Sequence, residues 1–159
     1  MNKLKISQVQ FQASHIPTLN AEFLEKSFNN TLKFKPHLIC TPECSNIITN
    51  DKSYLIFNAP YQNTCPVLKM AKDFAKKNKV NINLGSLLLR IKNKSKLVNR
   101  SFFINNYGVI KKTYDKIHMF DVEINNKEKH QESSLFKAGN KIIFTKINNI
   151  KLGMTICYD

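Results

Sequence analysis

The chain has 159 residues, 42% of them hydrophobic, which is enough to bury the core of one domain or of part of one. No run approaches the roughly 18 apolar residues that a membrane span needs, and no signal-peptide segment opens the chain, so we expect a cytoplasmic protein without a membrane partner. The charge of +14 comes from lysines spread along the chain without an aromatic RNA-binding motif, which favours a solvated surface over nucleic-acid binding.

The first half of the chain predicts alternating strands and helices. Asn20 is a candidate capping residue for the first helix, and a short apolar run delivers Glu43 at the end of a buried strand. In chain order we expect a strand over 3–12, a helix over 20–32, a strand over 37–43, an irregular stretch over 46–62 and a helix over 64–75.

The second half predicts hairpins and one long loop. In chain order we expect strands over 80–91 and 97–106, a turn over 105–108, an extended segment over 109–118, a loop over 121–141, and a hairpin of 141–147 and 150–157. The last strand is expected to end at Cys157. The whole pattern predicts a layered α/β fold with a mixed sheet.

Four cysteines are present without a secretion signal, so a disulfide framework is not expected. Cys40 and Cys44 have the spacing of half a zinc site, but the second pair of ligands is missing and the histidines are scattered. The spacing of the cysteines and histidines therefore does not predict a metal site.

Glu43, Lys116 and Cys157 each place a reactive group at or beside the end of a predicted extended segment, where scaffolds often present catalytic groups. A thiolate is a good nucleophile, a carboxylate can take and return its proton, and an ammonium stabilises an oxyanion. Taken singly, however, the cysteine fits an apolar core, the glutamate a helix terminus, and the lysine an ordinary surface. Spacing alone does not group them, because the chain has 25 basic residues.

The local sequences around these residues carry more information. TPECSN (41–46), YDKIHMFDV (114–122) and GMTICYD (153–159) resemble, in order, the blocks that hold the glutamate, lysine and cysteine of the nitrilase superfamily. QES (131–133) resembles the block of that family's second glutamate, and KISQVQ (5–10) resembles its opening strand. The resemblance is nearest to the branch that contains omega-amidase and the amidase of deaminated glutathione.

This resemblance implies an α-β-β-α sandwich that acts as a homo-oligomer and hydrolyses non-peptide carbon-nitrogen bonds of small amides without a metal or cofactor. By position, Cys157 is the nucleophile, Glu43 the general base, Lys116 the oxyanion stabiliser and Glu132 a supporting glutamate. His118 is interpreted as a loop residue outside the site. Carboxylate-bearing amides, such as short dicarboxylic monoamides, are the substrates that this branch suggests.

A family domain continues well past its nucleophile, so we expect residues 1–159 to be the N-terminal part of a C-terminally incomplete sandwich. An uncovered sheet would make such a chain unstable and weakly active. Two alternatives stay open beside an amidase. One is a non-catalytic remnant or interaction module of the same family, and the other is a basic protein that binds nucleic acid.

Overall fold

The computed structural model describes residues 3–125 and 128–159 of the chain. Its elements in chain order are β1 (Ile6–Gln8), α1 (Pro17–Thr31), η1 (Leu32–Phe34), β2 (Leu38–Cys40), α2 (Lys52–Asn58), η2 (Gln62–Thr64), α3 (Pro66–Asn78), β3 (Asn81–Arg90), β4 (Leu97–Ile104), β5 (Ile110–Asp115), β6 (Asp121–Asn125), β7 (Glu128–Gln131), α4 (Glu132–Leu135), β8 (Phe144–Ile147) and β9 (Ile150–Gly153). Among the described residues, no helix is long and apolar enough to cross a membrane.

The main sheet has five strands in the order β1-β2-β3-β4-β5. The first three strands run parallel because a helical segment connects each to the next, and β3, β4 and β5 then continue as antiparallel neighbours. The mixed sheet that the sequence predicts is therefore confirmed.

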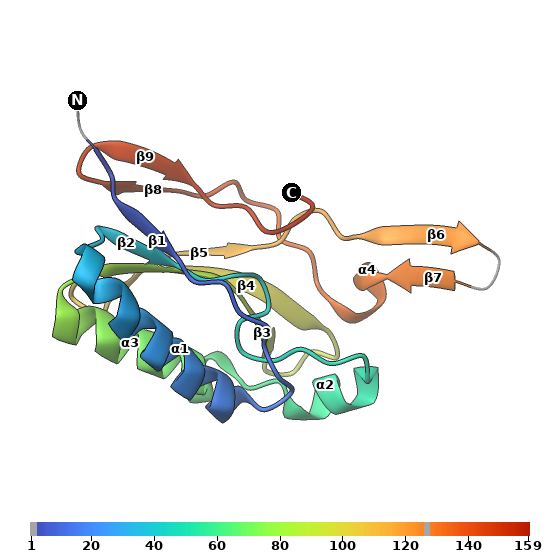
Figure 1. The fold of residues 1–159 in the computed structure, drawn as a ribbon. Helices are drawn as coiled ribbons and strands as arrows, with labels where there is room; N and C mark the ends of the chain where they lie inside the picture. The colour runs from blue at the N-terminus through green and yellow to red at the C-terminus, as the bar shows by residue number, and fades with distance from the viewer. Residues whose placement is uncertain (1–2, 126–127) are drawn as a thin grey trace.

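Helices α1 and α3 lie side by side over one face of this sheet (Figure 1). Their apolar sides and the sheet enclose the main core, in which Phe28 and Phe102 are fully buried. Complete burial of a side chain of this size stabilises a fold by about 1.5–3 kcal/mol. The helices thus fix the position of the strands whose ends carry the candidate residues.

The hairpin of β8 and β9 covers the opposite face of the sheet (Figure 1). Ile147, Met154 and Ile156 pack there against Phe103 of β4 and Tyr114 of β5. The described chain therefore forms three layers, helix, sheet and hairpin, in the order expected for the first part of an α-β-β-α sandwich.

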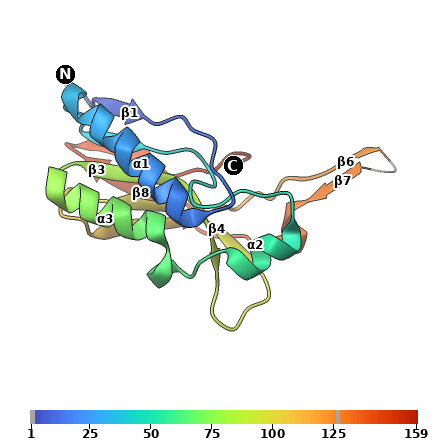
Figure 2. The same cartoon turned by 60° about the horizontal axis from the view of Figure 1, so that its bottom comes forward.

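Two stretches expected to lack regular structure contain short elements. Residues 46–62 include α2, whose first turn is capped by Asp51 accepting from the Tyr54 N–H at 2.9 Å. Residues 121–141 include β6, β7 and α4, and the two strands form an arm that projects from the body (Figure 2). These predictions were wrong because each element is too short for a periodic apolar pattern. Residues 126–127 of the predicted loop lie outside the described part.

Two local predictions also differ from the structure. Asn20 does not cap α1, because the helix begins at Pro17 and Asn20 belongs to its first turn. The Asn20 side chain accepts from the Ser14 N–H and donates to the Asn46 carbonyl. The final strand ends at Gly153, so Cys157 lies in the turn after it. A left-handed residue cannot continue a strand, and Cys157 has φ +50°.

Candidate active site

Glu43 lies in a tight turn directly after β2, as its position behind an apolar run predicts. The turn is closed by Ser45, whose hydroxyl donates to the Pro42 carbonyl at 2.6 Å. It is fastened to β3 by Ser86, whose hydroxyl accepts from the Cys44 N–H at 2.9 Å. The backbone that carries Glu43 is therefore fixed by hydrogen bonds within the turn and to β3.

Gly85 lets this turn approach β3. A Cβ atom at position 85 would lie 2.2 Å from the Thr41 carbonyl oxygen and 2.6 Å from the Pro42 oxygen. The pairing of β3 with β4 is also irregular between Leu84 and Leu87, as at a β-bulge. Strand β3 thus has a glycine and an irregular pairing at the point where the Glu43 turn packs against it.

Lys116 follows β5, and its ammonium is buried among carboxylates. Its Nζ donates to Oε1 and Oε2 of Glu132 at 3.0 and 2.8 Å and reaches Oε1 of Glu43 at 3.5 Å. The lysine side chain is 3% exposed, against 31% for Glu43 and 9% for Glu132. Glu132 begins α4 and also accepts from the Phe120 N–H at 2.7 Å, which fixes its carboxylate under the lysine.

Cys157 completes the group. It is exposed, and its thiol lies close enough to Glu43, Lys116 and Glu132 for the charges of these three residues to act on it. The structure therefore brings all four residues predicted from the sequence into one cluster. The thiol and the base face solvent, while the ammonium and the second glutamate lie beneath them.

The charges of the cluster set its protonation. Burial, followed by the charge and hydrogen bond of Glu43, raises the pKa of Cys157, and the opposing effect of Lys116 is smaller. Burial alone would lower the pKa of Lys116, but its hydrogen bond to Glu132 and the charges of both glutamates raise it. The resting site therefore holds a thiol beside a firmly charged ammonium, so the thiol needs a base to take its proton.

Two residues of this site were missed in the sequence. Asn99 on β4 donates from Nδ2 to Oε1 of Glu43 at 2.8 Å. Asp159 accepts from the N–H groups of Ile117 and His118 through Oδ1, at 3.1 and 2.9 Å. Each contact joins residues more than forty positions apart, so only a three-dimensional arrangement reveals it.

Asp159 also binds its own turn. Its Oδ2 accepts from the Tyr114 hydroxyl at 2.7 Å and from the Ile156 N–H at 3.0 Å, and its side chain is 4% exposed. Burial opposes its charge, but these hydrogen bonds lower its pKa below the ordinary value. Asp159 therefore connects the Cys157 turn to the end of β5, which is followed directly by Lys116. The His118 ring contacts the same carboxylate at 3.1 Å and stays exposed.

All four cysteines are free thiols. Among residues 3–125 and 128–159, no three His, Cys, Asp or Glu side chains are grouped so that they could hold a metal ion.

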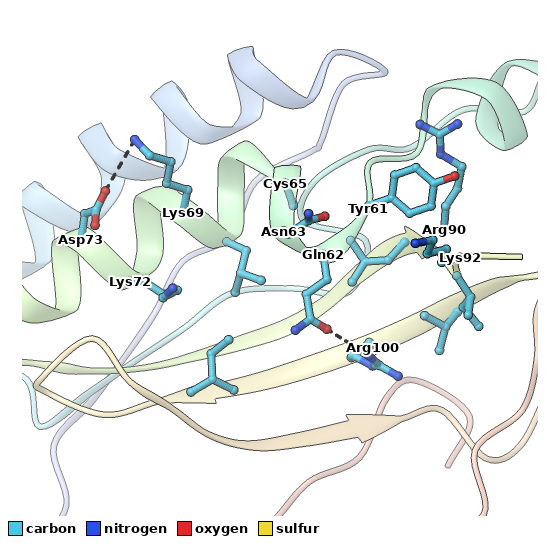
Figure 3. Close-up of a pocket in the computed structure, with 15 residues that line it drawn as sticks. Tyr61, Gln62, Asn63, Cys65, Lys69, Lys72, Asp73, Arg90, Lys92 and Arg100 are labelled. Atoms are coloured by element: carbon cyan, nitrogen blue, oxygen red, sulfur yellow. Dashed lines mark hydrogen bonds and ion pairs between the residues drawn. The ribbon is translucent and has the colours of Figure 1, made fainter.

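A separate cavity of about 760 Å³ lies between α3 and the sheet, and none of the four candidate residues lines it (Figure 3). Its cationic side chains mostly have partners within the protein. Lys69 pairs with Asp73, Arg90 stacks on Tyr61, and Arg100 bonds Gln62 and Asp115. The cations do not converge on a common point, so we assign this cavity no ligand.

The fold and the cluster define a class of protein, a layered α/β scaffold that presents a thiol to a carboxylate beside a buried lysine. Residues 11–159 match the model of the carbon-nitrogen hydrolase family, and the chain belongs to that family.

Among its relatives, the chain is 31% identical over 166 residues to deaminated glutathione amidase of Dictyostelium discoideum, covering 100% of this chain and 57% of that protein. It is 25% identical over 161 residues to omega-amidase NIT2 of Xenopus tropicalis, covering 100% of this chain and 56% of the relative. The chain thus spans little more than half the length of these relatives.

The structure is similar to that of the Caenorhabditis elegans NitFhit protein, with a TM-score of 0.87 and 26% identity over 98% of this chain and 38% of that one. This similarity confirms the nitrilase-like fold that the sequence predicts.

Proposed function

We propose that the chain forms the N-terminal part of an amidase that hydrolyses small amides to a carboxylate and ammonia through a thioester on Cys157. Glu43 is the general base, Lys116 stabilises the oxyanion, and Glu132 keeps the lysine charged and in place. One observation carries this proposal: the Lys116 ammonium lies 3.5 Å from Oε1 of Glu43 and 2.8 Å from Oε2 of Glu132, and the same Glu43 carboxylate acts on the Cys157 thiol, whose pKa it raises. A single carboxylate thus links nucleophile and cation.

The first half of the reaction forms the thioester. Glu43 takes the thiol proton as the sulfur of Cys157 attacks the amide carbon, and the C=O bond opens to a tetrahedral oxyanion near Lys116. The carbonyl then re-forms as the C–N bond breaks, and Glu43 gives its proton to the departing nitrogen, which leaves as ammonia. The raised pKa of the thiol makes this proton transfer necessary, since little thiolate exists at rest.

The second half of the reaction releases the product. Glu43 accepts a proton from a water molecule, whose oxygen attacks the thioester carbon and forms a second oxyanion beside Lys116. When this intermediate collapses, the C–S bond breaks and the thiolate recovers the proton from Glu43. The product is a carboxylic acid, and the side chains return to their starting states.

For the substrate, we propose small amides that carry a carboxylate, such as short dicarboxylic monoamides. Support comes from the names of two relatives, a deaminated glutathione amidase and an omega-amidase. The positive charge of the chain is compatible with an anionic substrate. A homo-oligomer stays a prediction of the family resemblance, and a cytoplasmic location stays a prediction of the sequence.

Intact-mass spectrometry tests the proposal. The chain is mixed with a short dicarboxylic monoamide, alone and together with a polypeptide that supplies the rest of the family domain, beside Cys157→Ala. An acyl adduct that disappears in the alanine variant is the expected result. If no folded form acquires an adduct, the amidase proposal is wrong and the chain is a non-catalytic member of its family.

A further inference from the structure

We propose that Asn99 is a positioning residue that holds the carboxylate of Glu43 against both the Cys157 thiol and the Lys116 ammonium. This inference rests on the proposed function, because it assigns Asn99 a task only if Glu43 acts as the base. It adds a residue to the site on grounds of contact and burial.

The contacts of Asn99 reach both partners of the base. Its Nδ2 donates to Oε1 of Glu43 at 2.8 Å, the same oxygen that lies 3.5 Å from Nζ of Lys116. Its main-chain carbonyl accepts from the N–H of Lys116 at 3.0 Å. One residue of β4 therefore fixes the side chain of the base and the backbone of the lysine, although 56 positions separate Asn99 from Glu43.

The burial of Asn99 argues against a purely structural role. The residue is 2% exposed and follows buried Leu97 and Val98 on β4. Its Oδ1 atom is buried and has no hydrogen-bond partner among the residues that the structure describes. A buried acceptor without a partner destabilises a fold, so an apolar side chain would serve stability better at this position. What the amide adds is the donor to Glu43.

The orientation of the amide follows from the same contacts. If the amide were flipped, Oδ1 would face the Glu43 carboxylate and two acceptors would repel each other. The geometry that places Nδ2 on Glu43 therefore leaves Oδ1 as the atom without a partner. That carboxylate is 31% exposed, so without Asn99 it is free to turn toward water and away from the thiol.

Asn99→Leu tests the inference through the pH dependence of Cys157 alkylation by iodoacetamide, followed by peptide mass spectrometry. The groups facing this thiol are Glu43, Lys116, Glu132 and Cys44. In the unsubstituted chain, Glu43 holds the alkylation midpoint high. Release of Glu43 lowers the midpoint by about one pH unit, toward that of Glu43→Gln, since a nearby like charge shifts a pKa by this order.

Two further readouts separate positioning from structure. Thermal unfolding of Asn99→Leu should occur at the same temperature or higher, because the variant removes a buried acceptor that has no partner. Where acylation by the amide is measurable, its rate should fall about ten- to a hundred-fold, as for a misplaced catalytic group.

Ser101→Ala is the matched control. Ser101 lies on the same strand, is 1% exposed and donates only to the Leu84 carbonyl at 2.8 Å. Its loss should lower stability and leave the alkylation midpoint unchanged.

The outcomes distinguish the two proposals. If the midpoint falls in Glu43→Gln but stays unchanged in Asn99→Leu, the positioning role is wrong while Glu43 still faces the thiol. If Asn99→Leu unfolds at a lower temperature and its midpoint is unchanged, Asn99 is a structural residue. If no adduct forms in the unsubstituted chain, either alone or with the rest of the family domain, but the alkylation midpoint falls in both variants, the amidase proposal fails and the placement of Glu43 by Asn99 stands.

Discussion

Replacement of Asp159 by alanine should destabilise the chain because four donors lose their acceptor together. The Tyr114 hydroxyl and the Ile156 N–H belong to residues that are each 3% exposed, so water cannot replace the carboxylate there without rearrangement. The N–H groups of Ile117 and His118 belong to less buried residues and can recover water. Two buried donors at about 1–3 kcal/mol each predict a loss of roughly 2–6 kcal/mol.

This loss is a large part of the 5–15 kcal/mol or so that stabilises a typical domain. For a chain of this length, each kcal/mol corresponds to about 2–4 °C in melting temperature, so Asp159→Ala should melt roughly 10 °C lower. Urea unfolding followed by far-UV circular dichroism measures the free energy directly, and the signal does not depend on tryptophan, which the chain lacks.

The control is Asp51→Ala, which removes an exposed carboxylate that accepts one hydrogen bond, from the Tyr54 N–H at the start of α2. Loss of such a cap costs about 1 kcal/mol. If Asp159→Ala costs no more than this control, Asp159 does not fasten the Cys157 turn to β5, and the reasoning is refuted.

The other predictions concern the geometry and charge of the site. The stabilisation by Asp159 should be present above the ordinary aspartate pKa of about 3.9 and disappear as pH falls through its lowered value, so urea unfolding of the unsubstituted chain and of the alanine variant should converge in acid. Gly85→Ala should cost about 1–3 kcal/mol in urea unfolding, because the new methyl group meets backbone oxygens at 2.2 and 2.6 Å; an unchanged midpoint would contradict the close packing. Glu132→Leu should cost on the order of 3 kcal/mol in the same assay, since it removes a 2.8 Å partner of buried Lys116. Glu43→Gln should lower the alkylation midpoint of Cys157 by about one pH unit, and a rise would show that the carboxylate does not face the thiol.

The layered fold could be predicted because its long elements are periodic. Helix α3 and strands β3 and β4 are long enough for apolar residues to repeat at helical or strand spacing, and the structure has them within one or two residues of the expected bounds, except at the end of the helix. Helix α2 and the β6–β7 arm are short, and the pattern within them is too brief to separate them from loops. Their existence depends on contacts that local sequence does not contain.

The candidate site could be predicted only where local sequence blocks carry it. Glu43, Lys116, Glu132 and Cys157 lie in such blocks, and the structure gathers them in one place. The hydrogen bonds that connect Asn99 and Asp159 to the rest of the site join residues between 41 and 56 positions apart. A buried asparagine after two apolar residues of a strand was a visible signal for the first. Nothing in the sequence around Asp159 indicates that it accepts hydrogen bonds from two segments.

The left-handed backbone at Cys157, with φ +50°, means that the fold gives up stability at the position of its thiol. A residue with a Cβ in this conformation costs on the order of 1 kcal/mol relative to glycine, which adopts it freely. Random mutation and selection for stability alone would therefore drive position 157 toward glycine. Stability and the proposed reaction therefore place opposite demands on position 157, because the glycine that would relieve the backbone has no sulfur.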